Sequence, residues 1–358
     1  MNLKGCSKIA LWSVVFAGAT GSVVGAHEAW LLTPSEVEAL SRAPMPDLFT
    51  NPWVLSGSAV LAGIVAIVAL QLEERVPMRV QPYVARATGM ATALAVGLGP
   101  LAVRIGLALM LGLGAVGGLP RVGVEVWSQP VLFVPDMHLA LVPGWDWLAP
   151  AAFGVAVLLL LGLLTRLAAF AVFVLSILGI VAFGAPFLSY APHFIAPALV
   201  LLAFGPGWLA SDRCIGLMPP MALSDCQRRV VWRVAMALVG GTFVYLGVAF
   251  KLFQPTLLIA ILEHARFPTF GLPMDVVALA MTGVEIVAGL VLAMGRLVRP
   301  VALFLLGAFT TFAVLLGETP LFHANLYGMA LVLLLAGAMP PRRSAVIAPS
   351  SARLVRGV

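Results

Sequence analysis

VVALAMTGVEIVAGLVLA, residues 276–293, is an apolar run long enough to cross a bilayer, and it carries one carboxylate, Glu285, near its centre. A charge at that depth has no water to solvate it, so an acid within a membrane span needs a partner and is a functional candidate by default. The nearest candidate partner is Lys251, in the segment YLGVAFKLFQP at residues 245–255. The sequence therefore predicts a polar site inside a membrane protein, built around Glu285 and Lys251.

The composition supports a membrane protein throughout the chain. Apolar residues make up 61% of the sequence and charged residues 10%, whereas about a quarter of the residues of a soluble domain are charged. The mean hydropathy is +1.06. A net charge of +6 would suit a nucleic-acid partner, but the charges lie in short loops between apolar runs, where basic excess is an orientation signal. We therefore expect a lipid bilayer, and no nucleic acid, as the partner.

Apolar segments long enough to cross roughly 30 Å of hydrocarbon divide the chain into spans. We expect an all-α polytopic protein with crossings at 53–70, 98–118, 147–164, 167–184, 194–210, 233–251, 275–294, 299–316 and 323–339. Residues 87–97 add too little for a further crossing, so we place them at the interface. The expected divisions are a segment at 27–97, a first helical unit at 98–210, a linker at 211–232, a second unit at 233–339 and a tail at 340–358.

Residues 1–26 have the pattern of a secretory signal, with lysines, then an apolar stretch, then small residues ending at Ala26. Cleavage there would leave His27 as the first residue, and an uncleaved signal anchor is the alternative. In the acidic segment that follows, Ser35 is expected to start a short amphipathic helix.

Basic residues are distributed unequally between the two sides of these spans. The proposed inner segments contain Arg75, Arg79, Arg86, Arg166, Arg213, Arg228, Arg229, Arg233, Arg296, Arg299, Arg342, Arg343, Arg353 and Arg356, and the outer segments contain Arg42, Arg121, Lys251 and Arg266. Positive charge favours the cytoplasmic side. We expect a protein of the bacterial inner membrane, with a periplasmic N-terminus after cleavage and a cytoplasmic C-terminus. The spacing of Cys214 and Cys226 in the inner linker matches no metal motif, which favours reduced thiols.

The two halves of the chain repeat each other. ALVLLAFG at 198–205 matches ALVLLLAG at 330–337 at six of eight positions, and GLLTRLAAF at 162–170 corresponds to GRLVRPVAL at 295–303. We therefore predict two parallel four-helix units, related by a pseudo-twofold axis along the membrane normal. Aligning Gly162 with Gly295 places Ala152 opposite Glu285, so that the first unit lacks the acid.

The second half resembles the DoxX/DoxD-like family of four-helix membrane proteins. The resemblance is carried by Arg233 at the start of a helix, YLGVAFKL at its end, the acid in VEIVAGLVLAMG, and GRLVRPVAL at the inner turn. The first half keeps only the arginine and the Gly-to-Arg spacing, and residues 1–86 lie outside the pattern. The resemblance implies a four-helix bundle and, through members associated with thiosulfate:quinone oxidoreductase, a quinone-linked redox role.

For that role we expect a site near the outer leaflet in which Glu285 relays a proton to a quinone, Lys251 holds an anionic group and His323 adds a hydrogen bond. The residues expected to bind the substrate with them are Tyr245, Thr282, Asn325 and Tyr327. Two alternatives remain open from the sequence. Glu285 and Lys251 can form a pair that only fixes packing, and Lys251 can instead extend to the membrane surface. We also expect a redox partner at the periplasmic face, and a homo- or hetero-oligomeric assembly.

The histidines suggest a second function. All five lie in segments assigned to the outer face, near the surface, and imidazoles gathered on one face can bind copper or zinc. A mature N-terminus at His27 would offer both an amine and an imidazole, with His138 or His264 completing the site. Dispersed histidines that bind no metal are the alternative, and a structural subunit without chemistry is the third hypothesis.

Overall fold

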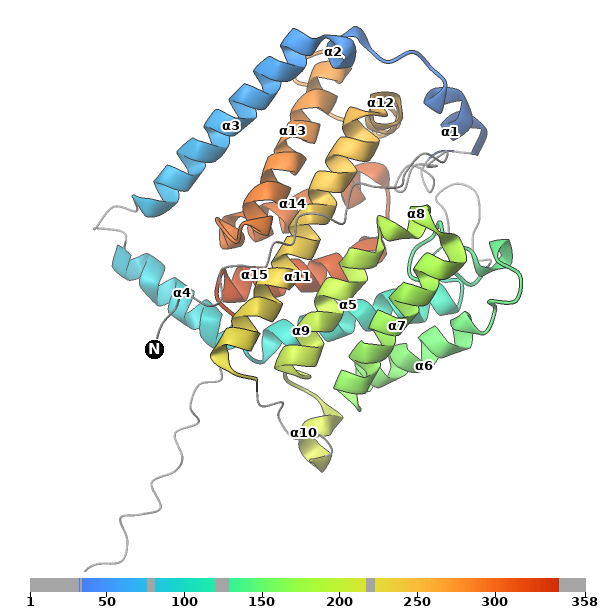
Figure 1. Ribbon diagram of the computed structural model, residues 1–358, viewed down its shortest axis with the longest axis vertical. Coiled ribbons are helices and arrows are strands. Elements are labelled where there is room, and N and C mark those ends of the chain that lie inside the picture. Colours follow the sequence, from blue (N-terminus) through green and yellow to red (C-terminus); the bar gives the residue numbers. More distant parts are fainter. Residues whose placement is uncertain (1–31, 33, 76–80, 120–128, 217–222, 341–358) are drawn as a thin grey trace, which may run out of the picture.

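The computed structural model describes residues 32, 34–75, 81–119, 129–216 and 223–340, and in these ranges the chain is helical with no strand. Figure 1 shows long helices side by side and shorter ones at both ends of the bundle. Six helices are long and apolar enough to cross a membrane, and four shorter helices are also apolar. The expectation of an all-α polytopic membrane protein is therefore confirmed.

Two successive groups of helices form the body of the protein. The first unit comprises α5 (Leu98–Ala115), α6 (Leu148–Leu161), α7 (Thr165–Phe183), α8 (Ala185–Leu188) and α9 (Ala191–Phe204). The second comprises α11 (Asp225–Leu246), its π-helical continuation η4 (Gly247–Leu252), α13 (Met274–Ala293), α14 (Val298–Leu316), η5 (Pro320–His323) and α15 (Ala324–Ala336). In each unit the first long helix packs on the second, the second on the third and the third on the last.

The two units join through a reciprocal exchange of contacts, in which the first helix of each packs on the last helix of the other. Thus α5 packs on α15, and α11 packs on α9. Glycines allow the closest approach, because a Cβ on Gly106 would overlap the backbone of Ala324, and one on Gly328 would overlap the backbone of Ala102. This reciprocity is the arrangement expected of two parallel copies around a pseudo-twofold axis.

The repeat extends to backbone conformation at the turn between the second and third helices of each unit. Gly162 and Gly295 end α6 and α13 in the left-handed region, with φ of 62° and 69°. Two residues later, Leu164 and Leu297 also have positive φ, 48° and 47°. A left-handed leucine is strained, so the same strain at both turns indicates a shared tertiary constraint.

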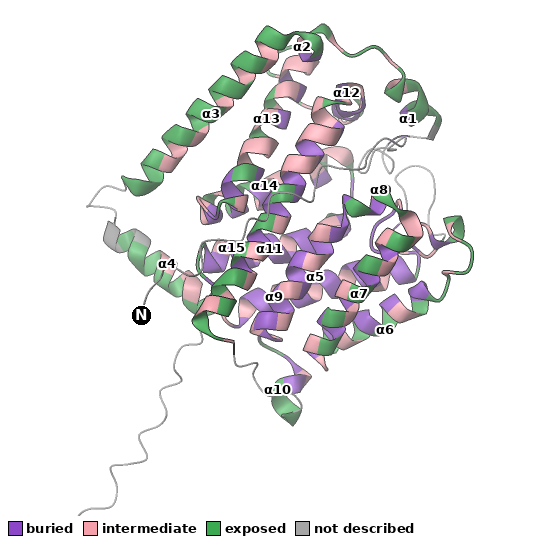
Figure 2. Cartoon of the chain, in the orientation of Figure 1, coloured by how far each residue is buried: buried purple, intermediate pink, exposed green. Residues whose placement is uncertain are grey.

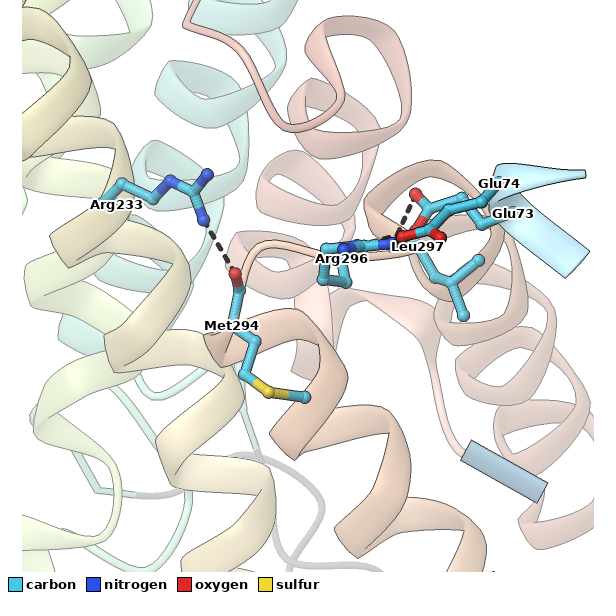
Figure 3. Close-up of polar contacts among 6 residues, drawn as sticks. All are labelled: Glu73, Glu74, Arg233, Met294, Arg296 and Leu297. Carbon is cyan, nitrogen blue, oxygen red and sulfur yellow. Dashed lines mark hydrogen bonds and ion pairs between the residues drawn. The ribbon is translucent and has the colours of Figure 1, made fainter. Parts of the chain in front are cut away.

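An arginine from the first helix of each unit lies against these glycines. A Cβ on Gly162 would overlap the Arg104 guanidinium, and one on Gly295 would overlap that of Arg233. Arg104 donates to the carbonyl of Leu209 at 2.7 Å, and Arg233 donates to that of Met294 at 2.7 Å (Figure 3). Met294 is the C-cap of α13, where a guanidinium satisfies a carbonyl that the helix leaves unbonded and suits the helix dipole. Arg104 instead binds a carbonyl of the loop between α9 and α10.

A second arginine in each unit binds the end of the last helix. Arg166 donates to the Leu202 carbonyl at 3.1 Å, and Arg299 donates to the Leu334 carbonyl at 3.1 Å. We call this side of the bundle the arginine end. Arg166 and Arg299, which the sequence analysis placed in inner segments, therefore both lie at this end.

The helix α3 (Pro52–Glu74) lies beside α13 and outside the repeat (Figure 1). It buries none of its residues, and Figure 2 shows it exposed along its length. Asn51 caps its N-terminus by accepting from the Trp53 amide at 3.0 Å. Four shorter elements flank the bundle: α4 (Gln81–Ala95) and α10 (Ser211–Ile215) at the arginine end, and α1 (Pro34–Ser41) and α2 (Asp47–Thr50) at the opposite end.

Carboxylates cap the third helix of both units, but they come from different parts of the chain. Asp212 of α10 accepts from the amides of Leu164 and Thr165 at 2.6 and 2.8 Å. At α14, Glu73 from the end of α3 accepts from the Leu297 amide at 3.1 Å. Glu73 and Glu74 also pair with Arg296 at 2.9 and 2.8 Å (Figure 3).

The Arg296 guanidinium is held in its charged form by this clamp. Hydrogen bonds to Glu74 and then to Glu73 raise the pKa of Arg296 above its ordinary value. The ion pairs tie the last turn of α3 to the turn before α14.

Three sequence expectations differ from the structure. The segment expected to be an outer loop before Met274 contains α12 (Pro255–His264), an apolar helix that packs on α13 and α1. The helix expected from Arg233 begins at Asp225, because Ser224 and Gln227 form a capping box there. The interfacial segment expected at 87–97 forms a longer helix, α4. The helix expected after Ser35 is confirmed as α1, whereas the signal at 1–26 and the tail at 341–358 lie outside the described residues.

Candidate functional site

Lys251 and Glu285 form an ion pair, in which the Lys251 ammonium donates to Glu285 Oε2. The pair joins η4 to α13, two segments apolar enough to cross a membrane. The Lys251 side chain is 24% exposed and that of Glu285 17% exposed. The expectation that Lys251 is the partner of the buried acid is therefore confirmed, and the alternative in which it extends to the surface is wrong for this conformation.

A seam of small residues brings the two helices close enough for this pair. A Cβ added to Gly240 of α11 would overlap the Gly289 carbonyl oxygen of α13, and one on Gly289 would meet the Gly240 carbonyl oxygen. Closer to Lys251, at the first residue of η4, a Cβ on Gly247 would overlap the Ile286 side chain. The two backbones are in contact at these glycines. Lys251 and Glu285, which follow on the same faces of the two helices, are therefore close enough to pair.

The backbone changes from α-helix to π-helix directly before the pair. Residues Gly247–Leu252 are π-helical, and the Phe253 amide donates to the Val248 carbonyl, five residues back, at 3.2 Å. Such short π segments occur frequently at functional sites, where they redirect side chains. Here the wider turn carries Lys251, and Pro255 then starts α12.

Two further predicted residues lie on the same helices as the pair. Thr282, one turn before Glu285, is buried, and its hydroxyl donates to the Ala278 carbonyl at 2.8 Å. The hydroxyl oxygen therefore keeps its capacity to accept. Tyr245 is half-buried and packs edge-on against Phe250, with ring centroids 5.8 Å apart.

The other predicted residues belong to a separate aromatic group at the start of α15. The His323 ring stacks on Phe309 at 5.7 Å, and Tyr327 packs edge-on against the same ring at 5.9 Å. The Tyr327 hydroxyl lies 3.1 Å from Thr310 Oγ1. Thus the structure joins Glu285 to Lys251, whereas it places His323 and Tyr327 around Phe309.

Asn325 and His323 line a small cavity with His193, a residue that the sequence analysis assigned to the surface. That assignment is wrong, because His193 is 3% exposed. The cavity has a volume of about 10 Å³ and is also lined by Met110, Tyr190 and Phe322. Asn325 Nδ2 donates to the His193 carbonyl at 3.1 Å. Neither Lys251 nor Glu285 lines this cavity.

The internal repeat in the sequence also predicts that His193 and Asn325 lie close together. The matched segments ALVLLAFG and ALVLLLAG place His193 at the position of Asn325, so both residues begin the last helix of their unit. Because α9 and α15 contact each other, residues at their starts come together. The repeat, extended five residues toward the N-terminus, points to this pairing.

The predicted metal ligands are not gathered into a cluster in the part of the chain that is described. His264 is exposed at the end of α12, and His138 is half-buried in a loop where it pairs with Val131. His27 lies outside the described residues. Among the residues with assigned positions there is no group of three or more His, Cys, Asp or Glu able to hold a metal ion. The copper or zinc site with His27 stays a prediction.

No protein-family model, no curated protein and no solved structure matches this chain. The likeness to the DoxX/DoxD-like family therefore remains a prediction that rests on the residues quoted above. The chemistry of the site has to be argued from its own geometry: a carboxylate and an ammonium group facing each other between membrane helices.

Proposed function

We propose that this protein is a membrane subunit of a quinone-linked redox system, with Lys251 and Glu285 at the quinone headgroup. The proposal places it in a bacterial inner membrane with the arginine end at the cytoplasm and α12 toward the periplasm. The observation that carries it is the ion pair itself, partly exposed between two helices that are long and apolar enough to cross a membrane. An acid in such a position usually has a function, since burial of a charge is costly.

The chemistry of a quinone suits an acid and an amine in contact. Reduction of a quinone to a quinol takes up two electrons and two protons, and the intermediate oxygens carry negative charge. A carboxyl group can deliver one of the protons, and an ammonium group can stabilise a developing negative charge. In this scheme the Glu285 carboxylate first takes up a proton from the aqueous side and then passes it to a quinone oxygen, while Lys251 holds the oxygen as it becomes negative.

The electrons must come from outside this site. A redox protein at the periplasmic face, bound as a separate subunit, is the donor in the proposed system. The second proton comes from the aqueous side. Thr282, one turn from Glu285, offers an acceptor oxygen beside the headgroup.

The test uses the membrane complex, purified with whichever subunits accompany this chain, and assays quinone reduction. Glu285→Gln is expected to abolish turnover while expression stays at the wild-type level. Glu263→Gln, a matched change at an exposed position of α12, is expected to leave turnover unchanged. Wild-type turnover in Glu285→Gln would rule out the proton relay.

The same experiment separates this function from a purely structural role. If the pair serves only to hold α11 against α13, replacement of both partners by apolar residues of similar size should leave the complex active. Activity in the double variant Lys251→Met/Glu285→Leu would therefore favour the structural role and exclude chemistry at this site.

A further inference from the structure

The cavity at the starts of α9 and α15 lies where the last helices of the two units meet. Its polar wall is made by His193 and Tyr190 from the first unit and by His323 and Asn325 from the second. Met110 of α5 adds a thioether. None of these residues is needed for the chemistry proposed at Lys251 and Glu285.

The size of the cavity limits what it can hold. A volume of about 10 Å³ is the space of roughly one water-sized sphere. Two histidines and one methionine are among the residues that line it, so imidazole and thioether groups surround one small space.

The imidazole of His193 indicates that the cavity holds a bound ion or water. His193 Nε2 is buried and has no hydrogen-bond partner among the described residues, and the whole residue is 3% exposed. A buried polar atom without a partner costs about 1–3 kcal/mol. Native structures usually satisfy such atoms with a bound ion or an ordered water.

The site is also held rigidly in place. Asn325 Nδ2 donates to the His193 carbonyl at 3.1 Å, which fixes the starts of α9 and α15 to each other. Tyr190 donates to Asp136 Oδ2 at 2.6 Å. Contacts of this kind, one shell out from a ligand, orient metal-binding side chains before the ion arrives.

We propose that this cavity binds a single monovalent soft metal ion, Cu(I), through His193, His323 and Met110. Imidazole and thioether are ligands that copper accepts, and a thioether favours the Cu(I) state. The described wall of the cavity holds no carboxylate or thiolate. Because the cost of burying an ion rises with the square of its charge, a divalent ion would cost about four times as much here without an anionic ligand.

This inference is independent of the proposed redox function and of the site predicted with His27. It uses ligands from both units, so that the ion would bridge the pseudo-twofold interface. The position explains why both units carry a polar residue at the start of their last helix, although only the second carries the membrane acid.

The test measures Cu(I) binding by the full-length protein in detergent, in competition with bicinchoninate. The wild type is expected to take up one equivalent, and His193→Ala to bind at least tenfold more weakly. Met110→Leu changes volume little, so it should fold, and it is expected to weaken binding about tenfold. X-ray absorption at the copper edge should show nitrogen and sulfur neighbours in the wild type, with the sulfur lost in Met110→Leu.

Two matched controls distinguish this site from the others. His264→Ala, at an exposed position, and His27→Ala should both still bind one equivalent of Cu(I). The proposal is overturned if the wild type binds no Cu(I), if His193→Ala keeps full affinity, or if the equivalent disappears with His27→Ala. Displacement of Cu(I) by an equal concentration of Zn(II) would likewise overturn the assignment to a monovalent ion.

Discussion

Gly240 of α11 and Gly289 of α13 lie back to back, so that a side chain on either would overlap the backbone of the other. This contact, and not attraction between charges, sets the distance between the two helices. Along the same seam, Lys251 lies about three helical turns from Gly240, and Glu285 lies about one turn from Gly289. The ion pair is therefore a consequence of a close backbone approach that only glycine permits at these positions.

Gly289→Ala should destabilise the protein, because the added methyl overlaps backbone atoms that cannot move independently. Overpacking of this kind costs about 1–3 kcal/mol. Gly283→Ala on the same helix is the control, since a Cβ there meets nothing within 4 Å, and it should be neutral or stabilising by up to about 1 kcal/mol. Unfolding in mixed SDS and detergent measures both. Equal stability of the two variants would show that the seam does not determine the spacing.

Removal of one member of the ion pair should cost more than removal of both. Lys251→Met leaves Glu285 charged between apolar helices, and Glu285→Leu leaves Lys251 in the same state. We expect each single variant to be less stable than the double variant, with a coupling energy of about 0.5–3 kcal/mol. The range lies below that of a fully buried pair because both side chains are partly exposed. A double-mutant cycle on unfolding free energies gives the coupling directly, and additive effects would contradict it.

The positions of the membrane helices followed from the sequence because each depends on local composition. A run of apolar residues has only one low-energy state in a bilayer, and Gly162 and Gly295 mark the turns where two such runs meet. The partnership of Lys251 and Glu285 was also predictable. It joins η4 to the middle of α13, and a lone charge in apolar surroundings has few possible partners.

Features that depend on tertiary packing could not be read in this way. The helix α12 escaped notice because its ten residues are too few to signal a span. The start of α11 was missed because its first two turns are charged, although Ser224 and Gln227 cap it. His193 and His323 lie far apart in the chain, and their shared cavity exists only because the two units pack across a pseudo-twofold axis.

Asp212→Asn should weaken the turn before α7. The Asp212 carboxylate is 5% exposed and accepts from the Leu164 and Thr165 amides, whereas an asparagine side chain offers only one oxygen. One amide would then face an NH2 group, at a cost of about 1–3 kcal/mol. The measurement is the unfolding free energy of Asp212→Asn, compared with Asp225→Asn at an exposed helix start.

Glu73→Gln tests the equivalent contact in the second unit and should have a smaller effect. The Glu73 side chain is 36% exposed, and exposed ion pairs contribute about 0–1 kcal/mol. The loss should shrink further as salt is added, since salt screens exposed charges. Proteolysis of the segment after α3, followed over time, would report release of this helix from Arg296. An effect as large as that of Asp212→Asn would show that the α3 clamp is buried in the native membrane.

Gly162→Ala and Gly295→Ala should both destabilise the protein, and by similar amounts, if the two units are true copies. Each glycine has a positive φ that alanine adopts only with strain, and the added methyl would overlap the Arg104 or Arg233 guanidinium. Strain and displacement together should cost about 1–3 kcal/mol. Gly154→Ala, inside α6 with open space at its Cβ, is the matched control and should not lower stability. Unfolding curves for the three variants decide the matter: a large loss at only one of the two turns would mean that the repeated backbone conformation has different causes in the two units.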